Sequence, residues 1–107
     1  MKEIESLRIG RHFRFGKSKI IVGRDKDEND KLLDLSKKLK AAIFECKEVV
    51  GPTTLLIGKN REAEEKAAEL TAFYSDAEKN GIKQVTVAKI KVNISKIDKE
   101  GLIKLRI

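Results

Sequence analysis

A stripe of small and apolar residues at helical spacing is the feature that most limits how this chain can fold. The stripe consists of Ala63, Ala67, Leu70, Tyr74 and Ala77. Residues three or four positions apart share one side of a helix, and Asn60 and Asn80-Gly81 are typical of a helix start and a helix end. Because small side chains let the helix backbone lie close to its neighbour, the stripe predicts a helix packed directly on a β-sheet.

The N-terminal part of the chain predicts a β-hairpin followed by a helix. Residues 11–15 alternate polar and apolar side chains, a Gly-containing loop follows, and residues 19–22 are mostly apolar and β-branched. Asp25 and Glu28 lie three residues apart and resemble a capping box with Asp25 as the helix cap. Leucines at helical spacing then predict a helix over about residues 26–40.

Four further segments predict strands. They are residues 42–50, 53–57, 85–94 and 102–107. Gly51-Pro52 joins the first two, and a turn near Gly101 joins the last two. The predicted order is β-β-α-β-β-α-β-β, with Lys89 and Lys91 on one face of the long strand. We therefore expect a single compact α+β domain over residues 1–107, with two helices packed on one face of a mostly antiparallel sheet.

The length and charge of the chain narrow the classes of protein to consider. At 107 residues the chain has the length of one domain. Its 24 Lys and Arg against 17 Asp and Glu give a formal net charge of +7. This excess is compatible with a nucleic-acid partner and also with a solvated, heat-stable surface. Abundant Lys, Glu and Ile beside one Pro, one Met and no Trp are thermophile-like.

The sequence also bears on the location of the protein. No apolar run approaches the roughly 20 residues that span a bilayer, and the first residues lack the apolar stretch of a signal peptide. The single cysteine, Cys46, cannot form an internal disulfide, which fits a reducing compartment. We expect a cytoplasmic protein without membrane association.

The residues that could carry chemistry favour a non-enzymatic protein. Nucleophilic catalysis by Cys46 needs a positioned base, and the only histidine is His12, in a predicted strand. A buried structural thiol is the favoured interpretation of Cys46. The acids at 25, 27, 28 and 30 lack the ligand pattern of a calcium loop, and helix capping explains them better. We therefore predict no catalytic residue, no metal and no cofactor.

Basic residues are the remaining candidates, and we predict that they bind nucleic acid. A first set lies on and after the hairpin: Arg11, Arg14, Lys19 and Arg24. A second, weaker set lies on the last strands: Lys89, Lys91, Lys104 and Arg106. Arg24 precedes a helix N-terminus, where it can grip a phosphate or pair with Asp25, Asp27 or Asp30. Phe13 and Phe15 lie between the cations and can stack on bases, although a place in the core is favoured.

Two motifs keep a distinctive order and separation along the chain. The first is a strand followed by Val22-Gly23-Arg24, four residues and Asn29-Asp30, and the second covers residues 65–77 with Ala67-Ala68 and Tyr74-Ser75. Together they resemble the NFACT-R domain, the RNA-binding domain on the C-terminal side of NFACT proteins. The similarity covers roughly residues 7–92. The stretch from residue 7 to residue 14 is also similar to the subtype attached to PP-loop proteins related to tRNA thiouridine synthases.

This resemblance implies an α+β fold and RNA binding, with tRNA or rRNA as the target and no catalytic residue in the module. It links the chain to ribosome-associated quality control or to tRNA modification. Two histidines typical of the family are absent from residues 43–53, and Asp25 stands where the family has Asn. The alternative is a protein-interaction or accessory module of a PP-loop tRNA-modifying enzyme.

Overall fold

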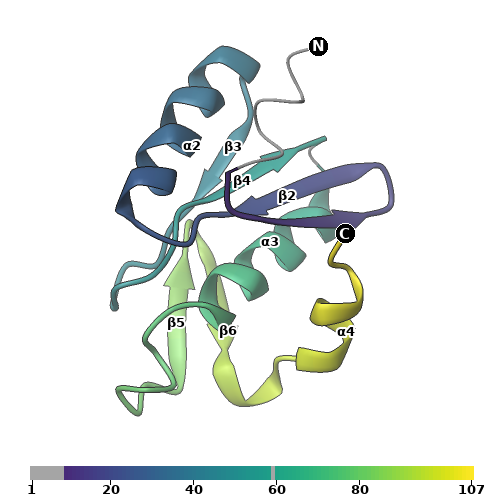
Figure 1. Ribbon diagram of the computed structural model, residues 1–107. Helices are drawn as coiled ribbons and strands as arrows, with labels where there is room; N and C mark the ends of the chain where they lie inside the picture. The colour runs from purple at the N-terminus through teal and green to yellow at the C-terminus, as the bar shows by residue number, and fades with distance from the viewer. Residues whose placement is uncertain (1–8, 59) are drawn as a thin grey trace.

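An antiparallel sheet of four strands forms the centre of the computed structural model, which describes residues 9–58 and 60–107. The strands are β1 (Arg11–Phe15), β2 (Ser18–Val22), β3 (Ala42–Phe44) and β4 (Thr54–Ile57). They lie in the order β1-β2-β4-β3, with every neighbour antiparallel (Figure 1). The expected N-terminal hairpin is confirmed, and Gly16 takes the positive φ of 59° that its tight turn requires. The α+β class is confirmed as well.

The two long helices cover opposite faces of this sheet. They are α2 (Lys26–Leu39) and α3 (Arg61–Phe73). On the α2 side, Ile21 and Leu55 bury against Leu32, whereas Ile20 and Leu56 point into the cluster formed with α3. The expectation that both helices lie on one face is therefore wrong. Adjacent residues of a strand point to opposite faces, so consecutive apolar residues in β2 and β4 require cover on both sides.

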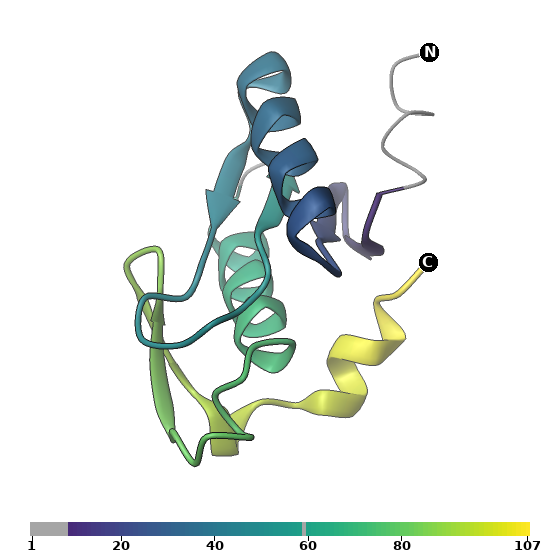
Figure 2. The same cartoon turned by 60° about the vertical axis from the view of Figure 1, so that its left-hand side comes forward.

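The segment expected as one long strand is a hairpin of two short ones. They are β5 (Gln84–Val87) and β6 (Ile90–Asn93), which pair with each other in a separate two-stranded sheet. The turn contains Ala88 in the left-handed region, at φ 56°. This hairpin contacts α3, and Figure 2 shows it on the side of α3 away from α2. Alternation of side chains predicted an extended chain correctly but carried no signal of the reversal at Ala88 and Lys89.

The C-terminal segment, expected as a strand over residues 102–107, instead begins as a helix that ends at Lys104. A short 3-10 turn, η1 (Ile94–Lys96), leads to α4 (Lys99–Lys104), which Asp98 caps by accepting a hydrogen bond from the Gly101 N–H at 3.0 Å. That cap and the burial of Leu102 outweigh the alternating pattern of the sequence. The chain end then runs beside β1, where Arg106 and Phe13 form an isolated antiparallel bridge.

The helix starts follow the sequence signals more closely than the ends do. Asp25 and Asn60 cap α2 and α3, as expected. The α3 helix ends at Phe73, well before Asn80-Gly81, because Ser75 and the following turns redirect the chain. Within residues 9–58 and 60–107, we find no helix long and apolar enough to cross a membrane.

Candidate nucleic-acid interface

Two clefts lie side by side at the N-terminal hairpin, and Arg11 lines both of them. The first, called the hairpin cleft, has a volume of about 370 Å³ and is lined by His12, Arg14, Lys19 and Arg106 beside Arg11. The second, called the turn cleft, has a volume of about 470 Å³ and is lined by Arg11, Arg24, Asn29, Gly51, Tyr74 and Asp76, among others. The structure thus brings together the first predicted basic set and one member of the second.

The register of the hairpin explains the cation density of the hairpin cleft. Arg14 on β1 lies directly opposite Lys19 on β2, so both side chains emerge from the same face of the sheet. Arg14 is exposed and Lys19 is partly exposed. Like charges at directly opposed positions disfavour a sheet. The pair therefore costs stability in the free protein, and a bound anion would relieve that cost.

Arg106 reaches the hairpin cleft through the docking of the chain end on β1. The Arg14 N–H donates to the Leu105 carbonyl at 2.9 Å, and the Ile107 N–H donates to the His12 carbonyl at 3.0 Å. These bonds hold an exposed arginine beside β1. The sequence predicted that Arg106 and Lys104 share one face of a C-terminal strand. In the structure, Lys104 belongs to the last turn of α4, and Arg106 lies beside β1.

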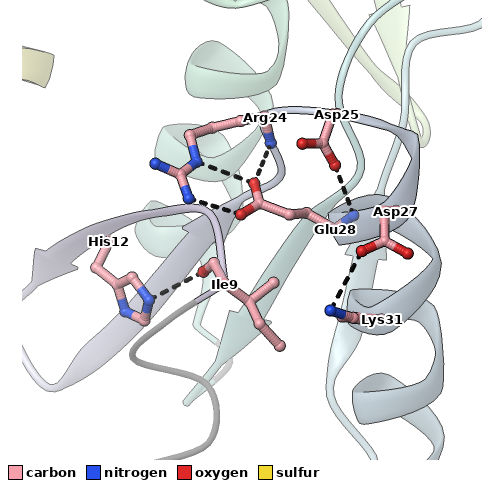
Figure 3. Close-up of polar contacts among 7 residues, drawn as sticks. All are labelled: Ile9, His12, Arg24, Asp25, Asp27, Glu28 and Lys31. Carbon is pink, nitrogen blue, oxygen red and sulfur yellow. Dashed lines mark hydrogen bonds and ion pairs between the residues drawn. The ribbon is translucent and has the colours of Figure 1, made fainter.

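His12 lines the hairpin cleft, and one of its two ring nitrogens lies within hydrogen-bond distance of a partner. Its Nε2 lies 3.0 Å from the Ile9 carbonyl oxygen and donates to it when that nitrogen carries the proton (Figure 3). Its Nδ1 is buried and has no hydrogen-bond partner among the residues that the structure describes. His12 was predicted only as a surface or strand residue. Its alternation with Phe13 along β1 places it on the cationic face.

Arg24 is held by Glu28 in a two-pronged ion pair. The guanidinium donates from Nε to Oε1 at 3.0 Å and from Nη2 to Oε2 at 2.7 Å, and the Arg24 backbone N–H donates to Oε1 at 2.9 Å (Figure 3). The Arg24 side chain is nonetheless 50% exposed, whereas that of Glu28 is 12% exposed. The expected acidic partners were Asp25, Asp27 or Asp30. That choice is wrong, because Asp25 caps α2 and Asp27 pairs with Lys31.

This ion pair changes the titration of Glu28. The hydrogen bond from the Arg24 guanidinium, aided by the backbone N–H groups of Gly10 and Arg24, lowers the pKa of Glu28 to about 2 against the opposing effect of burial. The same contact raises the pKa of Arg24. Glu28 therefore fixes the arginine and does not complete a capping box with the backbone of Asp25.

Gly23 and Asn29 fix the turn that carries Arg24. The Gly23 N–H donates to the Thr53 carbonyl at 2.9 Å, and the Thr53 N–H donates to Asn29 Oδ1 at 3.1 Å. A Cβ on Gly23 would clash with Asn29 Oδ1, so any other residue here must displace the Asn29 side chain. The glycine and asparagine of the first sequence motif therefore form one structural unit with β4.

Tyr74 joins the second sequence motif to the turn cleft. The Cζ atom of Arg11 lies 4.3 Å from the centroid of the Tyr74 ring, a cation–π contact. Phe73 meets the same ring edge-on, with centroids 4.8 Å apart. The sequence predicted Tyr74 on the inner stripe of a helix, whereas the structure places it in the lining of the turn cleft. No local pattern reveals that place, because α3 ends just before this residue.

The rest of the second basic set does not gather at this surface. Lys89 lies in the turn between β5 and β6. Lys91 lines a separate groove of about 490 Å³ beside α3, together with Glu64, Glu65 and Glu69. Phe13 is fully buried, and Phe15 packs on the core and lies 6.0 Å from the Lys66 ammonium, so the core interpretation of both aromatics is confirmed.

The described residues show no assembled catalytic group around Cys46. Its thiol is half-buried beside the Thr71 carbonyl, and burial raises the pKa of the thiol, which disfavours the nucleophilic thiolate. Within residues 9–58 and 60–107, no cluster of three or more His, Cys, Asp or Glu side chains is arranged to hold a metal ion.

An α+β domain with arginines and lysines gathered around a surface hairpin has the features of a nucleic-acid-binding module. A family model described as the NFACT protein RNA binding domain matches residues 10–102. The chain therefore belongs to this family of RNA-binding domains, which agrees with the prediction of a non-enzymatic module. No curated protein matches the sequence.

A solved structure has a similar fold. It is the C-terminal part of the fibronectin/fibrinogen-binding protein from Streptococcus suis, with a TM-score of 0.73 and 18% sequence identity. The alignment covers 94% of this chain and 50% of the other, so our chain spans about half the length of that structure. At this identity the likeness shows the fold alone.

Proposed function

We propose that this domain binds structured RNA, either tRNA or rRNA, mainly through the phosphate backbone. The observation that carries the proposal is the hairpin cleft, in which Arg14 and Lys19 oppose each other and Arg11 and Arg106 lie alongside. Membership of an RNA-binding family supports the class of partner. Arginine and lysine bind phosphate oxygens independently of sequence, so we expect weak sequence preference and strong salt dependence.

The predicted contact residues take different roles in this proposal. Arg14, Lys19 and Arg106 bind phosphates in the hairpin cleft. Arg11 and Arg24 serve the turn cleft, where Glu28 holds Arg24 in place. The remaining cations are peripheral contacts at most: Lys89, Lys91 and Lys104.

The proposal extends to the biological setting. We infer from the family resemblance that the protein works in the cytoplasm. Its role there would be in ribosome-associated quality control or in tRNA modification. In the second setting, a PP-loop tRNA-modifying protein would be the partner, and the domain would deliver tRNA to it or serve as its protein-binding accessory. A competition between tRNA and an rRNA helix of equal length for the isolated domain distinguishes the two RNA targets.

The test is a titration of fluorescent tRNA and an rRNA helix at several salt concentrations. The variant Arg14→Glu/Lys19→Glu/Arg106→Glu reverses three of the four Arg and Lys charges of the hairpin cleft and leaves Arg11, which also lines the turn cleft, in place. The matched control, Lys79→Glu/Lys83→Glu/Lys96→Glu, makes the same change in net charge with three exposed lysines at the β5–β6 end of the domain. Each phosphate contact contributes about 0.7–0.9 to the salt slope.

We expect the hairpin-cleft variant to lose at least about tenfold in affinity and about two units of salt slope. The control should stay within about threefold of the wild type at 0.15 M salt, where charges far apart are screened. Equal losses in the two variants would show non-specific attraction to net charge and contradict the proposal. Undetectable binding of the wild-type domain at low salt would also contradict it.

A further inference from the structure

The turn cleft has a composition different from that of the hairpin cleft. It combines the cations Arg11, Arg24 and Lys26 with the carboxylates of Asp25 and Asp76. Its wall also includes apolar surface from Val50, which is 76% exposed and lies near the buried Pro52. Carboxylates repel a phosphate backbone, and apolar surface makes no favourable contact with it. A ligand that suits this cleft must offer an anion, a flat apolar face and N–H donors.

Arg11 and Tyr74 supply a platform for a flat group. The Arg11 Cζ lies over the Tyr74 ring at 4.3 Å, and Phe73 braces the ring from its edge. Arg11 remains only half-buried, so it is accessible from the cleft. Arginine planes and aromatic rings are the surfaces on which proteins stack unpaired RNA bases.

Arg24 supplies an anion contact next to this platform. Glu28 takes the Nε and Nη2 atoms of the guanidinium, which leaves Nη1 outside that pair. The side chain is held by two bonds and is still half-exposed, so binding costs little ordering of the arginine. The remaining N–H groups can donate to a phosphate oxygen.

The acids limit which part of the ligand can approach them. Asp25 already accepts the Glu28 N–H at 2.9 Å, and the Asp76 backbone N–H donates to the Val50 carbonyl at 2.9 Å, which ties that residue to the rim of the cleft. The carboxylate of Asp76 repels phosphate but accepts hydrogen bonds from the amino and imino groups on the edge of a base.

We propose that the turn cleft is a subsite for one unpaired nucleotide of the bound RNA, with its base stacked on Arg11 and its phosphate at Arg24. The inference rests on the proposed function, since the neighbouring hairpin cleft would carry the adjoining backbone. Arg11 lines both clefts and connects the two contacts. The cleft volume of about 470 Å³ is within the range of roughly 300–1,000 Å³ found for small-molecule sites.

The experiment compares two blunt-ended RNA duplexes that have no loop and differ by one nucleotide. One has a continuous stem, and the other has the same stem with a single guanosine bulge. Their affinities for the domain are measured by fluorescence anisotropy at one salt concentration. We expect the wild-type domain to bind the bulged RNA about tenfold more tightly, as is typical when one base gains a stacking partner.

Two variants of the protein locate the effect. Arg11→Lys keeps the charge but loses the planar group, and should bring the affinity ratio of the two RNAs close to one. Val50→Glu adds a negative charge at an exposed rim position, where folding is not at risk, and should also reduce the ratio. Arg14→Lys, in the hairpin cleft, is the control and should keep the preference for the bulge.

The outcomes separate this inference from the function on which it rests. Equal and measurable binding of both RNAs by the wild type, or a bulge preference that survives both Arg11→Lys and Val50→Glu, would overturn the nucleotide subsite alone. Absence of binding to either RNA at low salt would overturn the proposed function. Amide NMR shifts of Gly51 and Asp76 on addition of the bulged RNA, and not of the continuous stem, would support the subsite directly.

Discussion

The carboxylate of Glu28 accepts hydrogen bonds from both the backbone N–H and the guanidinium of Arg24, four residues earlier in the chain. One acidic side chain thus fixes the turn after β2 and the arginine that the turn presents. Because Glu28 is buried and Arg24 is half-exposed, the pair connects the interior of the domain with its surface. Two of our predictions test this pair.

Replacement of Glu28 by glutamine should destabilise the domain. Glutamine keeps the shape but loses the charge and faces the donors of Arg24 with its own NH₂ group, which costs about 1–3 kcal/mol in the free energy of unfolding. Urea denaturation measures this value. Asp27→Asn is the control, because the Asp27–Lys31 pair is exposed and its loss should cost at most about 0.5 kcal/mol. Similar losses in the two variants would show that the buried contact is not special.

The stability of the domain should fall in acid partly because of Glu28. Its pKa in the folded protein is about 2, against an ordinary value of 4.5. Between these values the unfolded chain binds the proton and the folded one does not, so stability is lost as the pH falls from about 4.5 to about 2. We expect about 1–2 kcal/mol from this residue, after allowance for the solvent exposure of Arg24.

Denaturation at pH 7, 4, 3 and 2.5 checks this pH dependence, with Glu28→Gln as the reference protein. Glu48 also has a lowered pKa, owing to hydrogen bonds from the backbone and side chain of Thr86, but it titrates in both proteins. The difference between the two stability curves therefore isolates Glu28. A difference that stays constant over this range would contradict the assignment.

Gly23→Ala should disturb the turn that carries Arg24. The new methyl group would meet Asn29 Oδ1 and displace it from the Thr53 N–H. A clash together with a lost, partly buried hydrogen bond costs about 2–3 kcal/mol. Gly16→Ala meets open space and should cost only about 1 kcal/mol through its positive φ. Thermal unfolding measures both variants, and an equal loss in the two would contradict the role of the Gly23–Asn29 contact.

Arg14→Glu and Lys91→Glu should differ in their effect on RNA binding. Arg14 lies in the hairpin cleft, whereas in the groove of Lys91 three glutamates offset the charges of Lys91, Arg61 and Lys96. We expect Arg14→Glu to lower affinity about tenfold at 0.1 M salt and to reduce the salt slope by about 1, and Lys91→Glu to change affinity less than about twofold. Filter binding at four salt concentrations provides the comparison. The opposite order of effects would place the interface at the groove beside α3 that Lys91 lines.

Several features were predictable from the sequence because their causes are local. Asp25 and Asn60 cap helices through side chains that reach a backbone N–H three residues on. The three stripe residues that lie on α3, Ala63, Ala67 and Leu70, are buried because a helix returns to the same side every 3.6 residues. The two motifs also identified the RNA-binding family, since motif order along a chain does not depend on knowing the fold.

Other features depended on contacts between distant parts of the chain. The placement of α2 and α3 on opposite faces, the reversal at Ala88 and the helix at residues 99–104 were all missed. The residues of the last two segments suit more than one local structure, and packing against another element selects one. The placement of the helices depends on which strands become neighbours in the sheet.

The sequence by itself determined the helix caps, the N-terminal hairpin, the cation content and the family of this protein. Only the tertiary structure decided which cations act together. Arg106 joins Arg14 and Lys19 because the chain end docks on β1, whereas Lys91 faces glutamates of α3. Tyr74 meets Arg11 because the end of α3 lies beside the start of β1. Charge and spacing are properties of the chain, but a binding surface is a property of distances between residues far apart in it.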